Sequence, residues 1–248
     1  VRQSLVAGFS VEAIRTMLGG RFRASFRPLN DAIIQGRIVG VVGMVGCNNP
    51  KTRADSYIRT MVEELISRNV LVLQTGCAAQ ASAKTGWMTP ETAIAKAGAS
   101  LREVCEAVGI PPILHMGSCV DNCRILEAAA EIVREGGLGD DMSGLPAVGV
   151  APEWMSEKAV AIGCYFVASG VDVLLGLPFH IAGSENVTSF LQEEAKGMFG
   201  GAFYDAPDPI AGVETIMRLL QEAREKLGIN RKAERKLFDM KDRRALNV

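Results

Sequence analysis

The sequence predicts an α/β fold with a Rossmann-like parallel sheet flanked by helices. Apolar, strand-like runs alternate with helical runs along most of the 248 residues, a pattern typical of repeated βαβ units. Three of the strand-like runs end in a small residue followed at once by cysteine. Parallel strands have their carboxyl ends at one edge of the sheet, where α/β proteins bind ligands, so this repeated ending fits a parallel sheet.

The first half of the chain is expected to begin with a helix and then to alternate strands and helices. A helix over residues 10–18 has Ser10 as its N-cap and Gly19 as its stop. Pro90 begins a helix that runs to residue 108, where Gly109 ends it. Small residues fill segment 78–84. The other elements expected here are strands 38–45, 70–74 and 113–116 and helices 54–67 and 123–134.

The second half continues the alternation after a loop over residues 136–144. The expected strands are 147–150, 171–175 and a short 202–204, and the expected helices are 156–168, 185–196 and 210–227. Residues 1–228 are therefore predicted to form one domain. Residues 229–248 are dense in charged side chains, which predicts a solvated surface helix or a frayed end.

The composition excludes several classes of partner. A net charge of −1 gives no reason to expect nucleic acid or an anionic membrane. No apolar run reaches the ~18 residues that span a bilayer, so no membrane insertion is expected. The 6 cysteines are better explained as reduced thiols of a cytoplasmic protein than as a disulfide framework. The first residue is Val1, which suggests a fragment, a processed product or a chain shortened for expression.

Cys47, Cys77 and Cys119 are the candidate metal ligands. Each follows the expected end of a strand, so the fold would bring three thiols to one edge of the sheet. Thiolate is the ligand that iron–sulfur clusters and other soft metals select. The small residue before each cysteine lets the backbone approach a bulky inorganic group. The alternative is three buried core cysteines, since free cysteine is among the most buried residue types. Their shared position at strand ends favours the metal site.

Structural roles are expected for both histidines and for the remaining cysteines. No strand is followed by G-x-G-x-x-G, and the sequence has no P-loop and no G-x-S-x-G nucleophile elbow. His115 lies inside a strand and is expected in or near the core. His180 follows a strand end and is the better candidate of the two for a polar role, although a structural role is expected. Cys105 and Cys164 are expected in the core, and Cys123 is expected to begin a helix.

Longer motifs occur in a fixed order: GCNNPK at 46–51, TGCAA at 75–79, HMGSCVDN at 115–122 and SEKAVAIG at 156–163. Together they resemble the carboxy-terminal domain of the anaerobic nickel–iron–sulfur carbon monoxide dehydrogenases. The resemblance runs from about Leu5 to Gly228. It implies an oxidoreductase that interconverts CO and water with CO2, two electrons and two protons at a nickel–iron–sulfur cluster.

The resemblance also implies roles for individual residues. Cys47, Cys77 and Cys119 match cysteines that ligate the cluster, Lys158 matches the active-site lysine, and Ile162 matches an apolar residue that crowds the nickel. The implied partners are CO and CO2, a second copy in a homodimer and an electron carrier such as ferredoxin. A histidine and further cysteine ligands come from an earlier domain of the family that this sequence does not supply. The isolated chain is therefore expected to be inactive, and either metal-free or loaded with adventitious zinc or a partial iron–sulfur species.

The position of Lys158 agrees with an active-site role. It lies in the first turn of its expected helix, where the helix dipole disfavours a cation, so helix stability does not explain it. A carboxylate-like CO2 as hydrogen-bond partner explains it better, and burial would move its pKa toward a useful range. The alternative is an exposed lysine with its charge in water. Ile162 lies four residues later on the same side of the helix, where it would exclude water.

Two other functions stay open. The related hybrid-cluster proteins reduce hydroxylamine on an iron–sulfur–oxygen cluster, but they are not expected to carry the lysine motif of residues 156–163. A non-catalytic domain would instead hold structural zinc between Cys47, Cys77, Cys119 and Cys123. The absence of a C-x2-C knuckle from the sequence counts against zinc.

Overall fold

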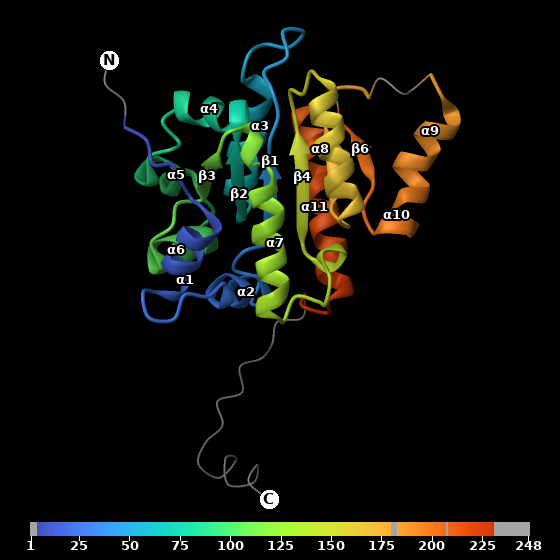
Figure 1. Ribbon diagram of the computed structural model, residues 1–248. Coiled ribbons are helices and arrows are strands. Elements are labelled where there is room, and N and C mark those ends of the chain that lie inside the picture. Colours follow the sequence, from blue (N-terminus) through green and yellow to red (C-terminus); the bar gives the residue numbers. More distant parts are fainter. Residues whose placement is uncertain (1–3, 180–182, 207, 231–248) are drawn as a thin grey trace, which may run out of the picture.

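A sheet of six parallel strands forms the centre of the molecule (Figure 1). The computed structural model describes residues 4–179, 183–206 and 208–230. The strand order β3-β2-β1-β4-β5-β6 is that of the doubly wound Rossmann sheet, so the predicted α/β fold is confirmed. The strands are β1 (Gly40–Met44), β2 (Val70–Thr75), β3 (Ile113–Gly117), β4 (Ala147–Ala151), β5 (Asp172–Leu175) and β6 (Phe203–Asp205).

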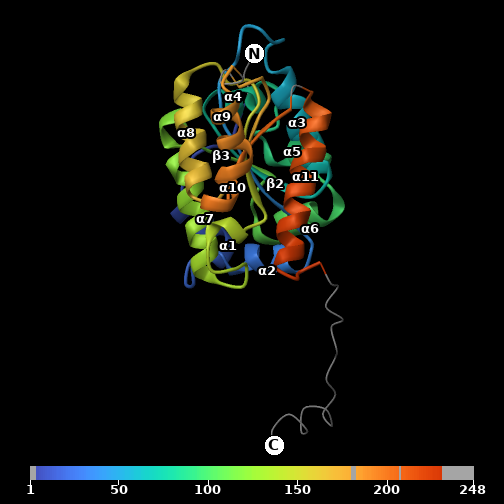
Figure 2. The ribbon, with the colours of Figure 1, turned by 90° about the vertical axis from the view of Figure 1, so that its right-hand side faces the viewer.

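Helices cover both faces of the sheet, which Figure 2 shows from its edge. On one face α3 (Ser56–Ser67) packs against α11 (Pro209–Lys226). On the other face lie α7 (Cys123–Glu135) and α8 (Glu157–Ala168). The remaining helices and turns are α1 (Val11–Gly19), α2 (Arg27–Ile34), α4 (Gly76–Lys84), α5 (Pro90–Lys96), α6 (Ala99–Val108), η1 (Cys119–Asp121), η2 (Met142–Gly144), α9 (Glu185–Ser189), η3 (Phe190–Glu194) and α10 (Ala195–Phe199).

The chain leaves β1 and β4 toward opposite faces of the sheet. β1 leads into α3 on one face, and β4 leads into α8 on the other. The two strands are neighbours, with Gly43 opposite Gly149. In doubly wound sheets ligands bind beside the carboxyl ends of two strands that diverge in this way. The fold therefore favours a site at the carboxyl edge of the sheet, which is at the top of Figure 1.

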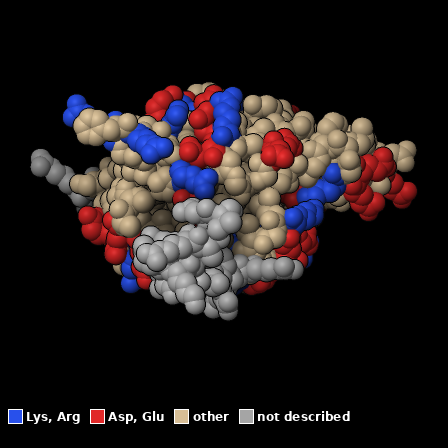
Figure 3. Space-filling view, turned by 90° about the horizontal axis from the view of Figure 1, so that it is seen from below, with Lys and Arg blue, Asp and Glu red and all other residues tan. Residues whose placement is uncertain are grey.

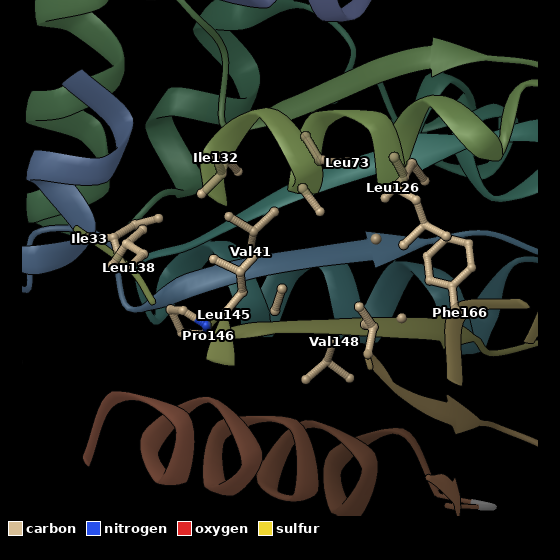
Figure 4. Close-up of a pocket in the computed structure, with 16 residues that line it drawn as sticks. Ile33, Val41, Leu73, Leu126, Ile132, Leu138, Leu145, Pro146, Val148 and Phe166 are labelled. Atoms are coloured by element: carbon tan, nitrogen blue, oxygen red, sulfur yellow. The ribbon is translucent and has the colours of Figure 1, made fainter. Parts of the chain in front are cut away.

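The core is packed between the sheet and these helices. Every residue of β1 and β2 is buried. Gly43 allows α7 to approach β1 closely, since a Cβ at this position would lie 2.8 Å from Ile125 Cγ2. Beside it, a pocket of about 30 Å³ lies between α7 and the strands β1 and β4 (Figure 4). Its lining is apolar and includes Val41, Leu126 and Phe166, so we interpret it as a packing gap and not as a site for a polar ligand.

Most of the predicted elements are confirmed. Ser10 Oγ accepts a hydrogen bond from the Ala13 N–H at 3.2 Å and caps α1. Gly109 adopts the left-handed conformation and ends α6. The helices α3, α7, α8 and α11 begin and end within 2 residues of the predicted bounds. Capping residues and the spacing of apolar residues were therefore sufficient to predict where the long amphipathic helices begin and end.

Other predicted boundaries are wrong. The helix predicted over 90–108 is two helices, because the Gly98 N–H donates to the Ile66 carbonyl at 2.9 Å and draws the chain out between α5 and α6. The helix predicted over 185–196 is interrupted by the π-helical turn η3, which apolar spacing over one turn does not distinguish from an α-helix. α2 was not predicted, and the small-residue segment 78–84 belongs to α4.

The face opposite the carboxyl edge carries interspersed basic and acidic side chains (Figure 3). None of the helices in the described part of the chain is long and apolar enough to cross a membrane. Of the predicted charged tail, the structure describes Ile229 and Asn230, whose oxygens accept hydrogen bonds from Arg224. Residues 231–248 lie outside the described residues.

Candidate functional site

The strand-end cysteines lie at the carboxyl edge of the sheet. Cys47 follows β1, Cys77 is the second residue of α4 directly after β2, and Cys119 begins η1 after β3. These three strands are neighbours, so their carboxyl ends lie side by side. Cys77 and Cys119 are exposed and Cys47 is half-buried. The alternative of three core cysteines is therefore wrong.

Glycine permits a close approach between two of the cysteine-bearing turns. Gly76 has a φ of 60°, in a backbone region that residues with a Cβ rarely adopt. A Cβ on Gly76 would also lie 3.1 Å from the Cβ of Cys119. The turn after β2, which carries Cys77, is thus in contact with the turn after β3. The small residue before Cys77 serves this contact between turns.

Lys158 reaches the same edge from the other half of the sheet. It is the second residue of α8, which follows β4. Its Nζ donates a hydrogen bond to the Sγ of Cys119 at 3.2 Å. β4 and β3 are separated by two strands, so this contact spans the edge of the sheet. The Lys158 side chain is exposed in this chain.

Ile162 lies one turn after Lys158 on α8 and packs inward. It is half-buried and lines a small apolar pocket together with Val45 and Ala151, at the carboxyl ends of β1 and β4. Residues four apart on a helix lie on the same side, but here Lys158 extends to Cys119 while Ile162 contacts the sheet. Ile162 therefore forms an apolar wall beside the edge.

A buried polar network that the sequence did not predict lies behind the cysteines. Glu153, between β4 and α8, is fully buried. Its carboxylate accepts hydrogen bonds from the backbone N–H groups of Asp55 and Tyr57 at 3.2 and 3.1 Å, where α3 begins. A carboxylate is favourable at a helix N-terminus. Burial raises the pKa of Glu153, and the hydrogen bonds from the backbone act in the opposite direction.

Asp55 extends this network to the cysteine-bearing segments. Its Oδ1 accepts a hydrogen bond from Asn48 Nδ2 at 2.7 Å, and its Oδ2 accepts one from Lys84 Nζ at 2.8 Å. Asn48 directly follows Cys47, and Lys84 ends α4, whose second residue is Cys77. The two carboxylates of the network are 98 positions apart in the sequence, so residue spacing gives no signal for their contact.

The other predicted residues take structural positions, with one exception. His115 is half-buried in β3, its Nδ1 accepts a backbone N–H at 3.2 Å, and burial lowers its pKa. Cys105 is buried, which raises its pKa to about 12, and Cys123 begins α7. Cys164 is exposed because α8 turns it away from the sheet, so its predicted core position is wrong. His180 lies outside the described residues.

The described residues contain no group of three or more His, Cys, Asp or Glu side chains that could hold a metal ion. A structural zinc site places four ligands about 2.0–2.3 Å from one ion, and Cys47, Cys77, Cys119 and Cys123 do not form such a site here. A four-iron cluster distributes its cysteine ligands over separate irons. Convergence of three of these sulfurs on one cluster stays a prediction.

Known proteins resemble this chain in sequence. Residues 6–210 match the Prismane/CO dehydrogenase family. Carbon monoxide dehydrogenase 1 of Methanosarcina mazei is 47% identical over 229 residues, and carbon monoxide dehydrogenase 1 of Carboxydothermus hydrogenoformans is 43% identical over 238 residues. Each match covers 92% of this chain. The chain therefore belongs to the Prismane/CO dehydrogenase family and resembles its carbon monoxide dehydrogenases.

Solved structures of this class also superpose on the chain. The nickel-free carbon monoxide dehydrogenase from Thermococcus sp. AM4 gives a TM-score of 0.85 at 50% identity, over 90% of this chain and 34% of its own. An acetyl-CoA synthase/carbon monoxide dehydrogenase, described with NiZn[Fe4S4] and NiNi[Fe4S4] clusters in its alpha subunits, gives 0.86 at 35% identity, over 91% of this chain and 34% of its own. The chain spans about a third of the length of its relatives, 35% of the M. mazei protein and 37% of the C. hydrogenoformans protein.

Proposed function

We propose that this chain is the carboxy-terminal part of an anaerobic carbon monoxide dehydrogenase, which interconverts CO and water with CO2, two electrons and two protons. The observation that carries the proposal is the 3.2 Å contact between Lys158 Nζ and Cys119 Sγ. It brings a proton-donating cation to one of the three thiols at the carboxyl edge. A soft-metal redox reaction that exchanges protons needs both groups together.

The donor set fits a nickel–iron–sulfur cluster. Cys47, Cys77 and Cys119 would hold it, because thiolates are the ligands that iron–sulfur clusters and other soft metals select. When bound, the cluster supplies the metal ions at which CO is oxidised and which take up its two electrons. Three thiolates leave such a cluster open on one side, so its remaining ligands would come from another part of the enzyme.

Lys158 and Ile162 have separate roles in this proposal. Lys158 donates a hydrogen bond to the substrate oxygen on which negative charge develops, and it holds the proton exchanged with water. Ile162 provides an apolar wall, with Val45 and Ala151 beside it, that excludes water from the place where a small gas reacts. Since Lys158 is not a metal ligand, its removal should affect turnover and leave the metal in place.

The active enzyme also needs polypeptide that this chain does not contain. The chain spans 35% of the M. mazei relative, and α8 presents exposed apolar positions that include Ala161 and Tyr165. We expect the amino-terminal part of the enzyme to cover this side and to supply a histidine and further cysteines. A homodimer, an electron carrier such as ferredoxin and a cytoplasmic location complete the proposal. The chain alone is expected to be inactive.

The test uses an enzyme assembled from this chain and the amino-terminal two thirds of a relative such as the M. mazei protein, here called the assembled enzyme. We expect it to oxidise CO anaerobically with a viologen dye as acceptor and to contain nickel and iron. Cys119→Ala should lose the cluster, because a methyl group leaves an iron without its ligand. Cys123→Ala, the matched control four residues later, should keep it. Unchanged nickel and iron in Cys119→Ala would contradict the ligand role.

A further inference from the structure

We infer that Asp55 is a positioning residue for Cys47. Asp55 fixes the loop after β1, which carries Cys47, against α4 and against the segment between β4 and α8. Asp55 acts through its contacts with Glu153, Lys84 and Asn48, here called the Asp55 network. The effect on Cys47 is a property of this chain alone. Its value for catalysis rests on the proposed function, in which Cys47 is a cluster ligand.

One carboxylate joins the two segments that carry Cys47 and Cys77. Asp55 accepts from Asn48 and from Lys84 through different oxygens, at 2.7 and 2.8 Å. The Asp55 side chain is 12% exposed and that of Lys84 is 53% exposed. The acceptor therefore lies inside the protein, and the cation that pairs with it lies at the surface. Hydrogen bonds to an ionised group are shorter and stronger than neutral ones. Because Asn48 is bonded directly to Cys47, fixing its side chain restricts the thiol.

Glu153 in turn fixes the orientation of Asp55. The Asp55 N–H donates to Glu153 Oε2, and the Tyr57 N–H donates to Glu153 Oε1. Asp55 has a φ of 62°, in the left-handed region that residues other than glycine adopt only when their surroundings determine it. The buried Glu153 supplies that determination, since it binds the backbone on both sides of Ser56. The carboxylate of Asp55 therefore faces the Cys47 loop in one orientation.

A second contact ties the Cys47 loop to the segment that leads to Lys158. Asn49 Nδ2 donates to the Trp154 carbonyl at 2.7 Å, directly after Glu153. Consecutive residues of the loop, Asn48 and Asn49, are thus held from two directions. Functional sites need their groups held within about 0.5 Å, and a buried polar network does this only when all its members are satisfied. The Asp55 network meets this requirement across the point where β1 and β4 diverge.

The experiment measures how fast each thiol of the metal-free, reduced 248-residue chain reacts with iodoacetamide, by peptide mass spectrometry. In Asp55→Asn the amide keeps one acceptor but loses the charged partner of Lys84. Cys47 should react roughly tenfold faster, because loss of a charge-assisted hydrogen bond favours local opening by about that factor. Cys123 and Cys164, on helices outside the network, should change by less than about twofold, the spread expected away from the lost contact. Equal rates for Cys47 in the wild type and Asp55→Asn would overturn the inference.

Variants of Lys84 keep the test decisive if Asp55→Asn unfolds, which alkylation of the buried Cys105 would reveal. Lys84→Gln removes the exposed member of the network and should also accelerate Cys47, while Lys84→Arg should restore the wild-type rate. Lys96→Gln is the matched control, because Lys96 of α5 pairs on the surface with Glu63 of α3, and neither residue belongs to the Asp55 network. If Cys47 reacts equally fast in Lys84→Gln and Lys96→Gln, Asp55 does not position the loop through this network.

Metal analysis of the assembled enzyme separates this inference from the proposed function. If both are right, Asp55→Asn lowers nickel and iron content and Cys47→Ala abolishes it. If Cys47 is accelerated in Asp55→Asn but Cys47→Ala retains its metal, the positioning stands and the ligand role of Cys47 falls. If Cys47→Ala loses the metal and Cys47 labelling is unchanged in Asp55→Asn, the reverse holds.

Discussion

α7 and α8 pack on the same face of the sheet, yet the sides that they turn away from it differ. Both helices approach Gly43 of β1, α7 with Ile125 and α8 with Phe166. On α7 most positions away from the sheet are charged: Arg124, Glu127, Glu131 and Arg134. On α8 the corresponding positions are exposed and mostly apolar: Ala161, Cys164, Tyr165 and Ala168.

The difference separates a helix whose outward side is charged and solvated from one whose outward side is apolar and would be covered in the proposed enzyme. The charges of α7 include the ion pair between Arg134 and Glu131, and such surface pairs contribute little beyond solubility. α8 has its exposed charges in its first turn, where Lys158 reaches Cys119. Exposed apolar patches mark interaction surfaces. In the proposed enzyme, loss of an outward side chain should therefore affect α8 more than α7.

The largest expected effect is on α8. In the assembled enzyme, Lys158→Ala should lower CO oxidation by about two to four orders of magnitude, the usual loss for a positioned proton-transfer or charge-stabilising group. Nickel and iron content should stay unchanged. Arg134→Ala on α7 is the control and should leave both quantities at the wild-type level. Full activity in Lys158→Ala with its metal in place would mean that the lysine is only a solvated surface charge.

A smaller effect, on the free energy of unfolding, is expected where the two helices approach the sheet. Gly43→Ala should lower the free energy of unfolding by about 1–3 kcal/mol, the usual cost of overpacking. Its Cβ would lie 2.8 Å from Cγ2 of Ile125 on α7, a β-branched side chain with one favoured rotamer in a helix. Gly149→Ala on the paired position of β4 should cost less than this, because its nearest atom is Phe166 Cδ1 of α8 at 3.1 Å.

Urea unfolding of the two variants and the wild type measures this difference. The reverse order, with Gly149→Ala less stable than Gly43→Ala, would show that α8 is held to the sheet more rigidly than α7. Equal m-values are required for the comparison, because they show that the unfolded states are alike.

The fold could be predicted from the sequence where local signals agree with tertiary packing. α7 begins at Cys123 and buries Ile125 and Ile132 at helical spacing, so periodicity alone located it. The break before α6 could not be predicted, because Gly98 fits beside Asn69 of a distant segment. A Cβ on Gly98 would lie 2.4 Å from Asn69 Oδ1, and the same oxygen accepts from the Leu101 N–H at 3.0 Å.

Some residues of the candidate site could likewise be predicted from the sequence, and others could not. Cys47, Cys77 and Cys119 could be placed at one edge because each follows a strand and parallel strands end together. The resemblance to a known family gave Lys158 an active-site role, but its contact with Cys119 was not predicted, since β4 and β3 are not neighbours. Glu153 was not predicted at all, because a buried carboxylate whose described partners are backbone N–H groups leaves no residue pattern in the sequence.

The smallest expected effect tests the outward faces of the two helices. In the isolated chain, Tyr165→Ala on α8 and Glu127→Ala on α7 should each change the free energy of unfolding by less than about 0.5 kcal/mol, as is usual for surface substitutions. In the assembled enzyme, Tyr165→Ala should be less stable by about 1 kcal/mol, because a ring that is 53% exposed in the chain is then buried by the amino-terminal part. Glu127→Ala should again have no effect. Thermal unfolding of the chain and of the assembled enzyme tests this prediction. An unchanged midpoint for Tyr165→Ala in both would mean that the outward side of α8 is exposed to solvent, like that of α7.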